Sequence, residues 1–202
     1  MKSQLRLAGT IVVAMVTVSG VCAAPKAWVP NRTLQAKLAA VQRAGAFELQ
    51  PPADYELQTH PAPHGAALEA WVSAPRPDGT RCYLMLLTLH GPAGGKKYKL
   101  QEVENKMLAG VRRRRSSWKQ SPSESGTING VSFIRTYWKG ADAQTGQMMH
   151  GFSYVARDGS GFLQLSSQDV EPYNTETLPL MEASALTVKR LPGKSIRRTS
   201  RR

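Results

Sequence analysis

The segment with the clearest chemical pattern is Gly91-Pro-Ala-Gly-Gly-Lys-Lys97, which lies between an apolar predicted strand and a predicted helix. A loop that wraps a nucleotide phosphate needs four residues between its first Gly and a Gly-Lys-Ser/Thr, so that backbone N–H groups surround the phosphates and the hydroxyl meets magnesium. Here three residues separate Gly91 from Gly95, and Lys97 stands at the hydroxyl position. The pattern therefore argues against nucleotide binding. A plain connector stays open, as does a weak anion site at the helix N-terminus aided by Lys96 and Lys97.

The other reactive residue types do not form a recognisable site. His60 and His64 are four residues apart, but the prolines between and beside them exclude the helix that would direct both side chains to one metal ion. Cys82 lies in an apolar strand without a neighbouring base, which predicts a buried, unreactive thiol. Asp169 and Glu171 alternate at a strand end, where surface carboxylates are ordinary. We therefore expect no catalytic residue, no metal site and no cofactor.

Positive charge is concentrated in two segments of a chain whose net charge is +13. The first is the run Arg112, Arg113, Arg114 and Arg115 at the end of a predicted helix. The second is the C-terminal segment with its basic residues Lys194, Arg197, Arg198, Arg201 and Arg202. A solvated helix end, which the helix dipole favours, and a solubilising tail are the simplest interpretation. The alternative is a polyanion-binding surface. In it, the arginine run joins Lys119 and the cluster of Lys96, Lys97 and Lys99, or the tail binds acidic lipid, cell-wall polymer or nucleic acid.

The N-terminal segment is typical of a secretory signal peptide. Lys2 and Arg6 precede an uncharged, apolar stretch, and Val21-Cys22-Ala23 places small residues where a signal peptidase cleaves. We predict cleavage after Ala23 and a secreted or periplasmic location. The alternative is an uncleaved membrane anchor, because residues 7–24 reach the short edge of what spans a bilayer. No later apolar run is long enough to span a membrane, and Cys82 alone remains after cleavage, so no internal disulfide can form.

The mature chain of about 179 residues has the usual size of one domain. We expect an extended leader and a short helix over residues 24–45, an α+β domain over residues 46–191, and a disordered basic tail over residues 192–202. The strands predicted at 81–89 and 131–139 carry apolar side chains on both faces, which places them in a sheet that is covered on both sides. Helices near 33–43, 98–112 and 177–186 can supply these covers.

Turn residues predict how the strands connect. Asn129-Gly130 and Asp158-Gly159 are tight-turn pairs, and they join strands of a meander that must be antiparallel. The closing helix is expected to have Pro179 in its first turn, where a missing N–H does no harm. We therefore predict an α/β/α sandwich around a mainly antiparallel β-sheet of about six to seven strands.

The segments AFELQPPADYEL, INGVSFIRTYW and ALTVKRL follow one another in a characteristic order, separated by a strand and a helix and then by a meander and a closing helix. Over residues 46–191 this order resembles the PsbP-like superfamily. That superfamily takes its name from an extrinsic subunit of photosystem II and includes a nuclear-import accessory factor and many small exported bacterial proteins. The resemblance implies a non-enzymatic role in binding or assisting another protein. It implies no site residue, because it lies in the order of elements.

Three functions stay open at this point. The first is an exported, non-enzymatic binding or accessory protein whose protein partner is unknown. The second is a polyanion- or cell-envelope-binding protein that acts through the basic helix end and the tail. The third is an enzyme whose site is assembled from residues far apart in the sequence, which spacing alone does not exclude.

Overall fold

The computed structural model describes residues 25–61, 66–89 and 98–192. Three helices are found there: α1 (Arg32–Gln35), α2 (Leu100–Arg112) and α3 (Asn174–Ala185). The strands of the main sheet are β1 (Lys26–Ala27), β4 (Glu56–Pro61), β5 (Ala67–Val72), β6 (Tyr83–Leu89), β7 (Arg115–Gln120), β8 (Glu124–Ile128), β9 (Val131–Asp142), β10 (Met148–Asp158) and β11 (Gly161–Val170). A small second sheet has β2 (Gln42–Ala44), β3 (Phe47–Leu49) and β12 (Lys189–Arg190).

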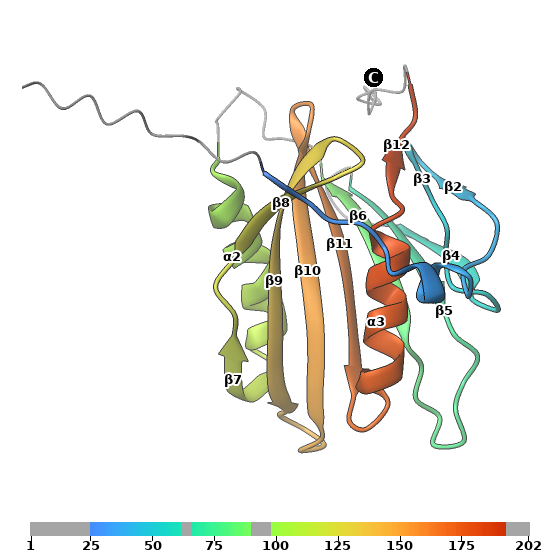
Figure 1. Cartoon of the computed structure of the whole chain (residues 1–202). Helices are drawn as coiled ribbons and strands as arrows, with labels where there is room; N and C mark the ends of the chain where they lie inside the picture. Colours follow the sequence, from blue (N-terminus) through green and yellow to red (C-terminus); the bar gives the residue numbers. More distant parts are fainter. Residues whose placement is uncertain (1–24, 62–65, 90–97, 193–202) are drawn as a thin grey trace, which may run out of the picture.

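The main sheet has the strand order β1-β8-β9-β10-β11-β6-β5-β4, and β7 also pairs with β9 (Figure 1). The three strands β9, β10 and β11 form the antiparallel meander that the turn residues predict. At the β8–β9 turn, Asn129 and Gly130 both have positive φ, 47° and 81°, and this conformation lets Ile128 pair with Val131. At the next tight turn, Asp158 pairs with Gly161.

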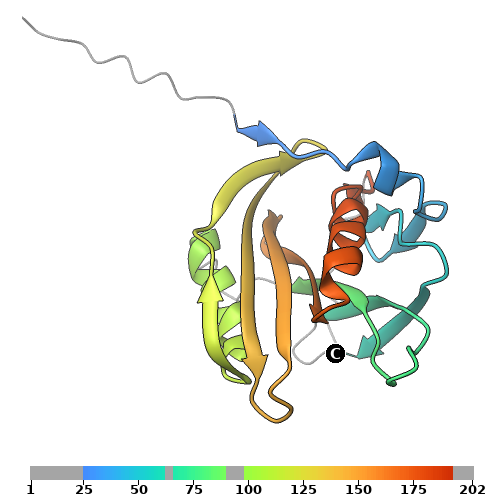
Figure 2. The ribbon, with the colours of Figure 1, turned by 60° about the horizontal axis from the view of Figure 1, so that its bottom comes forward.

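The two faces of the sheet are covered by different helices. Along β10, Tyr154 packs into the core under α3, while the adjacent Val155 packs with Val103 of α2. This alternation follows from the two-residue period of a strand. Figure 2 shows the sheet curving around α3, with α2 against its other face. The predicted α+β class and the sandwich layers are therefore confirmed.

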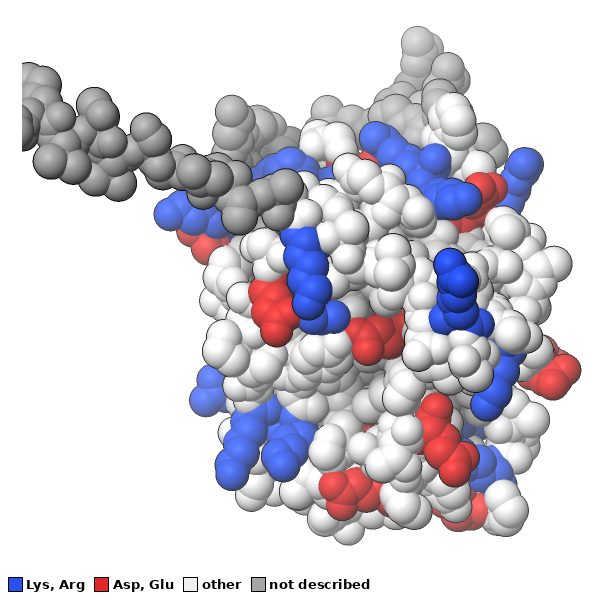
Figure 3. Space-filling model, viewed as in Figure 1, with Lys and Arg blue, Asp and Glu red and all other residues white. Residues whose placement is uncertain are grey.

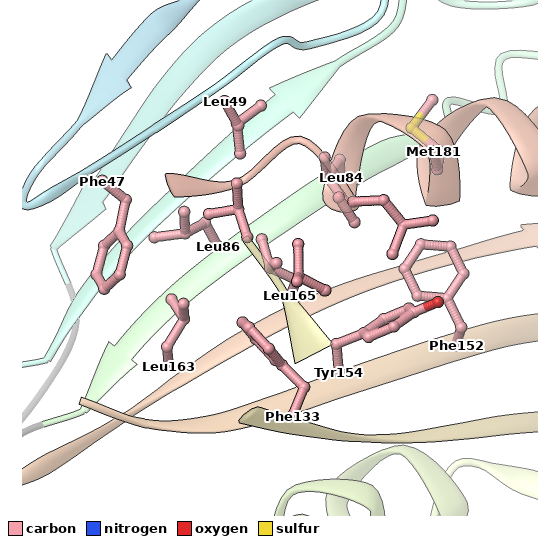
Figure 4. Packing of buried hydrophobic residues seen from close by; sticks show 14 of the residues in the cluster. Phe47, Leu49, Leu84, Leu86, Phe133, Phe152, Tyr154, Leu163, Leu165 and Met181 are labelled. Atoms are coloured by element: carbon pink, nitrogen blue, oxygen red, sulfur yellow. The ribbon is translucent and has the colours of Figure 1, made fainter. Parts of the chain in front are cut away.

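The larger core lies between the sheet, α3 and the small second sheet. Figure 4 shows side chains from β3, β6, β9, β10, β11 and α3 pointing toward one another. They include Phe47, Leu49, Leu84, Leu86, Phe133, Phe152, Tyr154, Leu163, Leu165 and Met181. Each buried side chain of this size contributes roughly 1.5–3 kcal/mol by leaving water, so this cluster supplies much of the packing energy that positions α3.

The structure corrects three details of the prediction. The strand count is higher than six to seven, because the residues of the leader and the segment after α2 also pair. The helix expected over 33–43 ends at Gln35: residues 42–44 pair with β3 instead, and Leu38 bridges to Pro52. The closing helix begins at Asn174, so Pro179 lies inside α3 and not in its first turn.

The leader joins the main sheet through β1. Lys26 and Ala27 pair in parallel with Gly126 and Thr127 of β8, and the Trp28 N–H bonds to the Thr127 carbonyl at 2.8 Å. The Trp28 side chain is 6% exposed. No helix in the described residues is long and apolar enough to cross a membrane.

Candidate functional site

A cluster of polar side chains joins α3 to the sheet beneath the N-terminal segment. Glu182 of α3 accepts hydrogen bonds from the hydroxyls of Tyr137 in β9 and Tyr154 in β10. It also accepts one from Nη1 of Arg135 at 3.3 Å. The Trp28 ring lies over Arg135, with its centroid 4.6 Å from the guanidinium carbon. We call these five residues the Glu182 cluster.

The environment of the two tyrosines decides what this cluster can do. Burial raises the pKa of Tyr137 and of Tyr154, and the neighbouring Glu182 carboxylate raises both further. Both phenols therefore stay protonated near neutral pH and act as hydrogen-bond donors. Because both phenols and Arg135 donate to the one Glu182 carboxylate, the role of the cluster is to hold α3, the sheet and Trp28 together.

A second polar cluster lies at the other end of α3. Arg76 forms two hydrogen bonds to Asp169 in β11, at 2.8 Å from Nη1 and 2.6 Å from Nη2. Thr177 of α3 also donates to Asp169, and the Arg76 guanidinium lies 4.2 Å from the ring centroid of Tyr173. Burial by itself would raise the pKa of Asp169, but the bonds from Arg76, Thr177 and the Val170 N–H lower it below its usual value. Asp169 is therefore held as a buried carboxylate.

This arrangement differs from the surface carboxylates expected at the end of β11. Asp169 is 3% exposed and faces Arg76, whereas Glu171 lies at the surface and contacts His150 at 2.7 Å. The two acids therefore have different partners. No local pattern pointed to Arg76, which is more than ninety positions before Asp169.

Cys82 is buried immediately before β6, as its apolar neighbours predict. Its sulfur lies 3.9 Å from the hydroxyl oxygen of Ser167. Burial raises the pKa of the Cys82 thiol to about 11, and the nearby Asp169 carboxylate raises it further. The thiol is therefore an unreactive part of the core.

We expect Cys82 in the folded mature chain to react with a disulfide reagent at pH 8 at least a hundredfold more slowly than in the denatured chain. A pKa of about 11 leaves on the order of 0.1% thiolate at that pH, against roughly a quarter at the ordinary value, and burial adds to the protection. Absorbance of the released thiolate measures the rate. Comparable rates for the folded and the denatured chain would show that Cys82 is accessible.

A surface hollow of about 420 Å³ opens between the N-terminal segment, the small second sheet and the end of α3. We call it the N-terminal hollow. Leu49 and Leu186 form part of its apolar lining, and Val29 and Val41 stand at its edges. These two valines are the most exposed large apolar side chains in the described residues, at 75% and 55%. Exposed apolar groups around a hollow are typical of a binding surface.

Each exposed valine follows or precedes a residue that is fixed to the core. Trp28 is buried in the core, so Val29 must point outward. Next to Val41, the side chain of Gln42 accepts a hydrogen bond from Nε1 of the buried Trp71 at 2.7 Å. Both valines are thus presented from anchored backbone, which reduces the entropy lost when a partner binds.

The arginine run is divided by the fold. Arg112, Arg113 and Arg114 are exposed at the end of α2. The Arg115 side chain is 3% exposed, bonds to Asp142 at 2.8 Å and also bonds to Gln168. Burial thus removes Arg115 from the surface that we considered for polyanion contact, because β7 begins at that residue and turns it inward.

The remaining predicted basic contacts are not placed together. Lys96 and Lys97 lie outside the described residues, as do the tail residues Lys194, Arg197, Arg198, Arg201 and Arg202. Lys99 precedes α2, so it lies at the opposite end of a 13-residue helix from Arg112, about 20 Å away. Figure 3 shows basic residues interspersed with acidic ones over the face that carries α3.

The described residues include no group of three or more His, Cys, Asp or Glu side chains that could hold a metal ion. His150 contacts Glu171 at the surface. His64 and the loop Gly91–Lys97 with its proposed anion site lie outside the described residues, and so does the predicted signal peptide.

Sequence reasoning missed the N-terminal hollow and the Glu182 cluster. The signal for the hollow was the pattern Trp28-Val29-Pro30 in the leader. A large aromatic residue beside a valine suggests that one of the two side chains is buried and the other is exposed. Glu182 had no local signal, because its partners come from strands 28 and 45 positions earlier.

Comparisons with known proteins identify the architecture. No protein-family model and no curated protein sequence matches the chain. Among solved structures, the cyanobacterial PsbP of Synechocystis is similar with a TM-score of 0.55 and 11% identity, over 75% of this chain and 93% of that one. A protein of unknown function from Pseudomonas aeruginosa, PA94, is similar with a TM-score of 0.50 and 8% identity, over 77% of this chain and 98% of that one.

LpqN of Mycobacterium tuberculosis, described as involved in cell envelope biogenesis, is 17% identical over 82% of this chain and 98% of its own, with a TM-score of 0.44. Identities this low concern the fold alone. The agreement with the cyanobacterial protein covers most of both chains. The chain therefore has a PsbP-like fold.

Proposed function

We propose that the chain is an exported, non-enzymatic accessory protein that binds a partner protein at the N-terminal hollow. The observation that carries this proposal is the pair of anchored, exposed valines, Val29 and Val41, on the edges of an apolar hollow. Exposed apolar side chains around a hollow mark protein–protein interaction sites, and such a hollow can take up an anchor side chain of the partner. The predicted cleavage after Ala23 would leave this edge of the hollow in the exported chain.

The charges around the hollow favour an acidic partner segment with an apolar anchor residue. Arg32 and Lys189 line the hollow and are exposed, and neither forms an ion pair within the described part of the chain. Glu48 is the one acidic residue in the lining. A partner carboxylate could therefore meet either cation while its apolar neighbour enters the hollow.

The polar clusters support a binding role in preference to catalysis. The groups with shifted pKa values in the two clusters are Tyr137, Tyr154, Asp169, Arg76 and Arg135, and all of them are engaged by neighbours within the fold. Catalytic groups are instead poised toward a space where substrate can enter. The hollow itself is lined by valine, leucine, amide and hydroxyl side chains together with three charged residues.

Site-specific photo-crosslinking in cells of the source organism tests the proposal. A photoreactive amino acid at Val29 or at Val41 is expected to capture the same protein. Gln144 is the matched control, because it is exposed in the β9–β10 turn and does not line the hollow. Replacing Val41 by Asp should reduce capture from position 29 by at least tenfold, since it places a charge where the apolar anchor is desolvated.

Two outcomes would contradict this assignment. Equal capture from Gln144 would mean that the contact is unspecific. Capture that survives Val41→Asp but disappears on removing residues 193–202, or in high salt, would mean that the basic tail carries the binding, as the polyanion alternative requires.

A further inference from the structure

A separate cavity lies against the opposite face of the sheet, between the C-terminal half of α2 and the strands β6, β9, β10 and β11. We call it the α2 cavity. Its volume is about 270 Å³, near the lower end of small-molecule sites, which span roughly 300–1,000 Å³. At about 30 Å³ for each water-sized group, it has room for about nine such groups, which is the size range of a molecule with a single ring.

The part of the cavity wall that β11 forms is polar. Gln164, Ser166 and Gln168 alternate along one face of β11, and Ser153 of β10 lies opposite Ser166 in the register. A central strand under a helix normally presents apolar side chains on that face. The opposite face of β11 follows this rule with the buried Leu165. Packing against α2 therefore does not account for the polar residues.

Two of these polar side chains are buried and only partly paired. Gln164 is 5% exposed and Ser153 is 1% exposed. The Gln164 amide nitrogen donates to the Ser153 hydroxyl oxygen at 3.0 Å. The Gln164 amide oxygen has no hydrogen-bond partner among the described residues, yet it is not fully enclosed by protein atoms. A donor from a bound molecule would satisfy this acceptor.

The other walls of the cavity are apolar. Met85 and Leu87 line it from β6, and Met107 and Val111 line it from α2. All four are half-buried. Methionine side chains adapt to the shape of a bound group and make favourable contacts with aromatic rings. These walls suit a flat apolar body that lies between the helix and the strand.

Arg114 supplies a cation at one end. It lines the cavity and is exposed, and it forms no ion pair within the described part of the chain. Burial raises the pKa of Tyr83, which pairs with Gln168 across the strands, and the charge of Arg114 opposes this increase. Gln164 lies four residues from Gln168 along β11, a distance of about 13 Å. The side chain of Arg114 extends along part of this distance, which leaves room for one ring between its guanidinium group and the Gln164 amide oxygen.

We infer that the α2 cavity binds a compact aromatic monocarboxylate that carries a hydroxyl group. The carboxylate pairs with Arg114, the ring lies between Met85 and Met107, and the hydroxyl donates to the amide oxygen of Gln164. The α2 cavity and the N-terminal hollow lie against different faces of the sheet, so either assignment can fail without the other.

An NMR titration of the ¹⁵N-labelled mature chain with 4-hydroxyphenylacetate tests this inference. We expect a Kd of about 1 mM, which is reasonable for so small a molecule, with chemical-shift changes confined to the elements that line the cavity, which are α2, the α2–β7 connection, β6, β9, β10 and β11. The neutral 4-hydroxyphenylacetamide and the hydroxyl-free phenylacetate should each bind about tenfold more weakly, because each loses one of the two polar contacts. Changes spread over other elements, or equal affinity for the acid and its amide, would overturn the inference.

Matched variants locate the two polar contacts. Arg114→Gln is expected to weaken the acid about tenfold and leave the amide unchanged, whereas Arg113→Gln, one residue earlier and outside the cavity lining, should change neither. Gln164→Leu should remove the preference for 4-hydroxyphenylacetate over phenylacetate. Because Arg114 is exposed, its variant reports on binding even if Gln164→Leu disturbs the fold. Equal weakening by the Arg113 and Arg114 variants would mean that only the general positive charge is involved, and the inference would fail.

Discussion

Replacing Arg76 by methionine is expected to lower the free energy of unfolding by about 3 kcal/mol at pH 7, because it leaves a buried carboxylate without its cation. The side chain of Asp169 is 2% exposed and that of Arg76 is 15% exposed. Methionine keeps an unbranched apolar side chain at this position but lacks the guanidinium, so the loss reports on the ion pair with Asp169 together with the contact to the Tyr173 ring. Denaturant unfolding followed by tryptophan fluorescence measures it.

The same variant should have a distinctive pH dependence. In the wild-type chain the pKa of Asp169 lies below its usual value, so this group contributes stability above about pH 4 that is lost as the pH falls further. In the variant, burial without the cation raises the pKa of Asp169, so the folded state takes up a proton. The difference in stability between the two proteins should therefore narrow as the pH falls from 7 toward 4.

Arg81→Met is the matched control for this prediction. Arg81 lies in the same connection between β5 and β6, is exposed, and forms no ion pair within the described residues. Its replacement should change stability by less than about 0.5 kcal/mol. Destabilisation of the same size by both variants, or a difference that does not depend on pH, would show that the pair with Asp169 is not what stabilises this end of α3.

Replacing Glu182 by alanine is expected to lower the free energy of unfolding by about 3 kcal/mol, because it removes the shared acceptor of three donors. Tyr154 is fully buried, so its hydroxyl cannot turn to water, and Arg135 would keep only its bonds to Glu124 and to the Tyr154 hydroxyl oxygen. Hydrogen exchange at the Trp28 N–H should accelerate as well, since Trp28 packs on Arg135 and Tyr154. Denaturant unfolding and exchange rates together measure the effect.

Two controls separate the network from helix propensity. Glu182→Gln keeps an oxygen at the accepting position and should cost about 1 kcal/mol, because it removes the charge alone. Glu176→Ala makes the same substitution in the first turn of α3, where Glu176 is exposed, and should change stability by less than about 0.5 kcal/mol. If all three variants are equally stable, the Glu182 cluster does not hold α3 to the sheet.

Local patterns in the sequence predicted a large part of the fold. The turn pairs Asn129-Gly130 and Asp158-Gly159 predicted the meander, because the positive φ that such turns need is available to few residues. The apolar alternation of β6 predicted a sheet covered on both sides. These features depend on neighbours within a few residues, so they can be read without knowing the tertiary structure.

The same patterns were insufficient where a partner came from far along the chain. Helical spacing of Leu34 and Leu38 predicted a helix beyond residue 40, but pairing with β3 gives residues 42–44 a hydrogen-bonded strand instead. The N-terminal leader was predicted to be an extended segment, and the structure shows that part of it pairs with β8 at the edge of the main sheet. In both cases contacts between distant residues outweigh local preference, which amounts to only a few tenths of a kcal/mol for each residue.

By itself, the sequence determined the α+β class, the antiparallel meander, the burial of Cys82 and the order of elements that resembles PsbP. Only the tertiary structure decided which of four adjacent arginines is buried, that Asp169 faces Arg76, and that Val29 and Val41 meet at one hollow. The physical reason is that periodicity and turn chemistry act between neighbours. Ion pairs, hollows and cavities depend on which side chains the folded chain brings opposite one another.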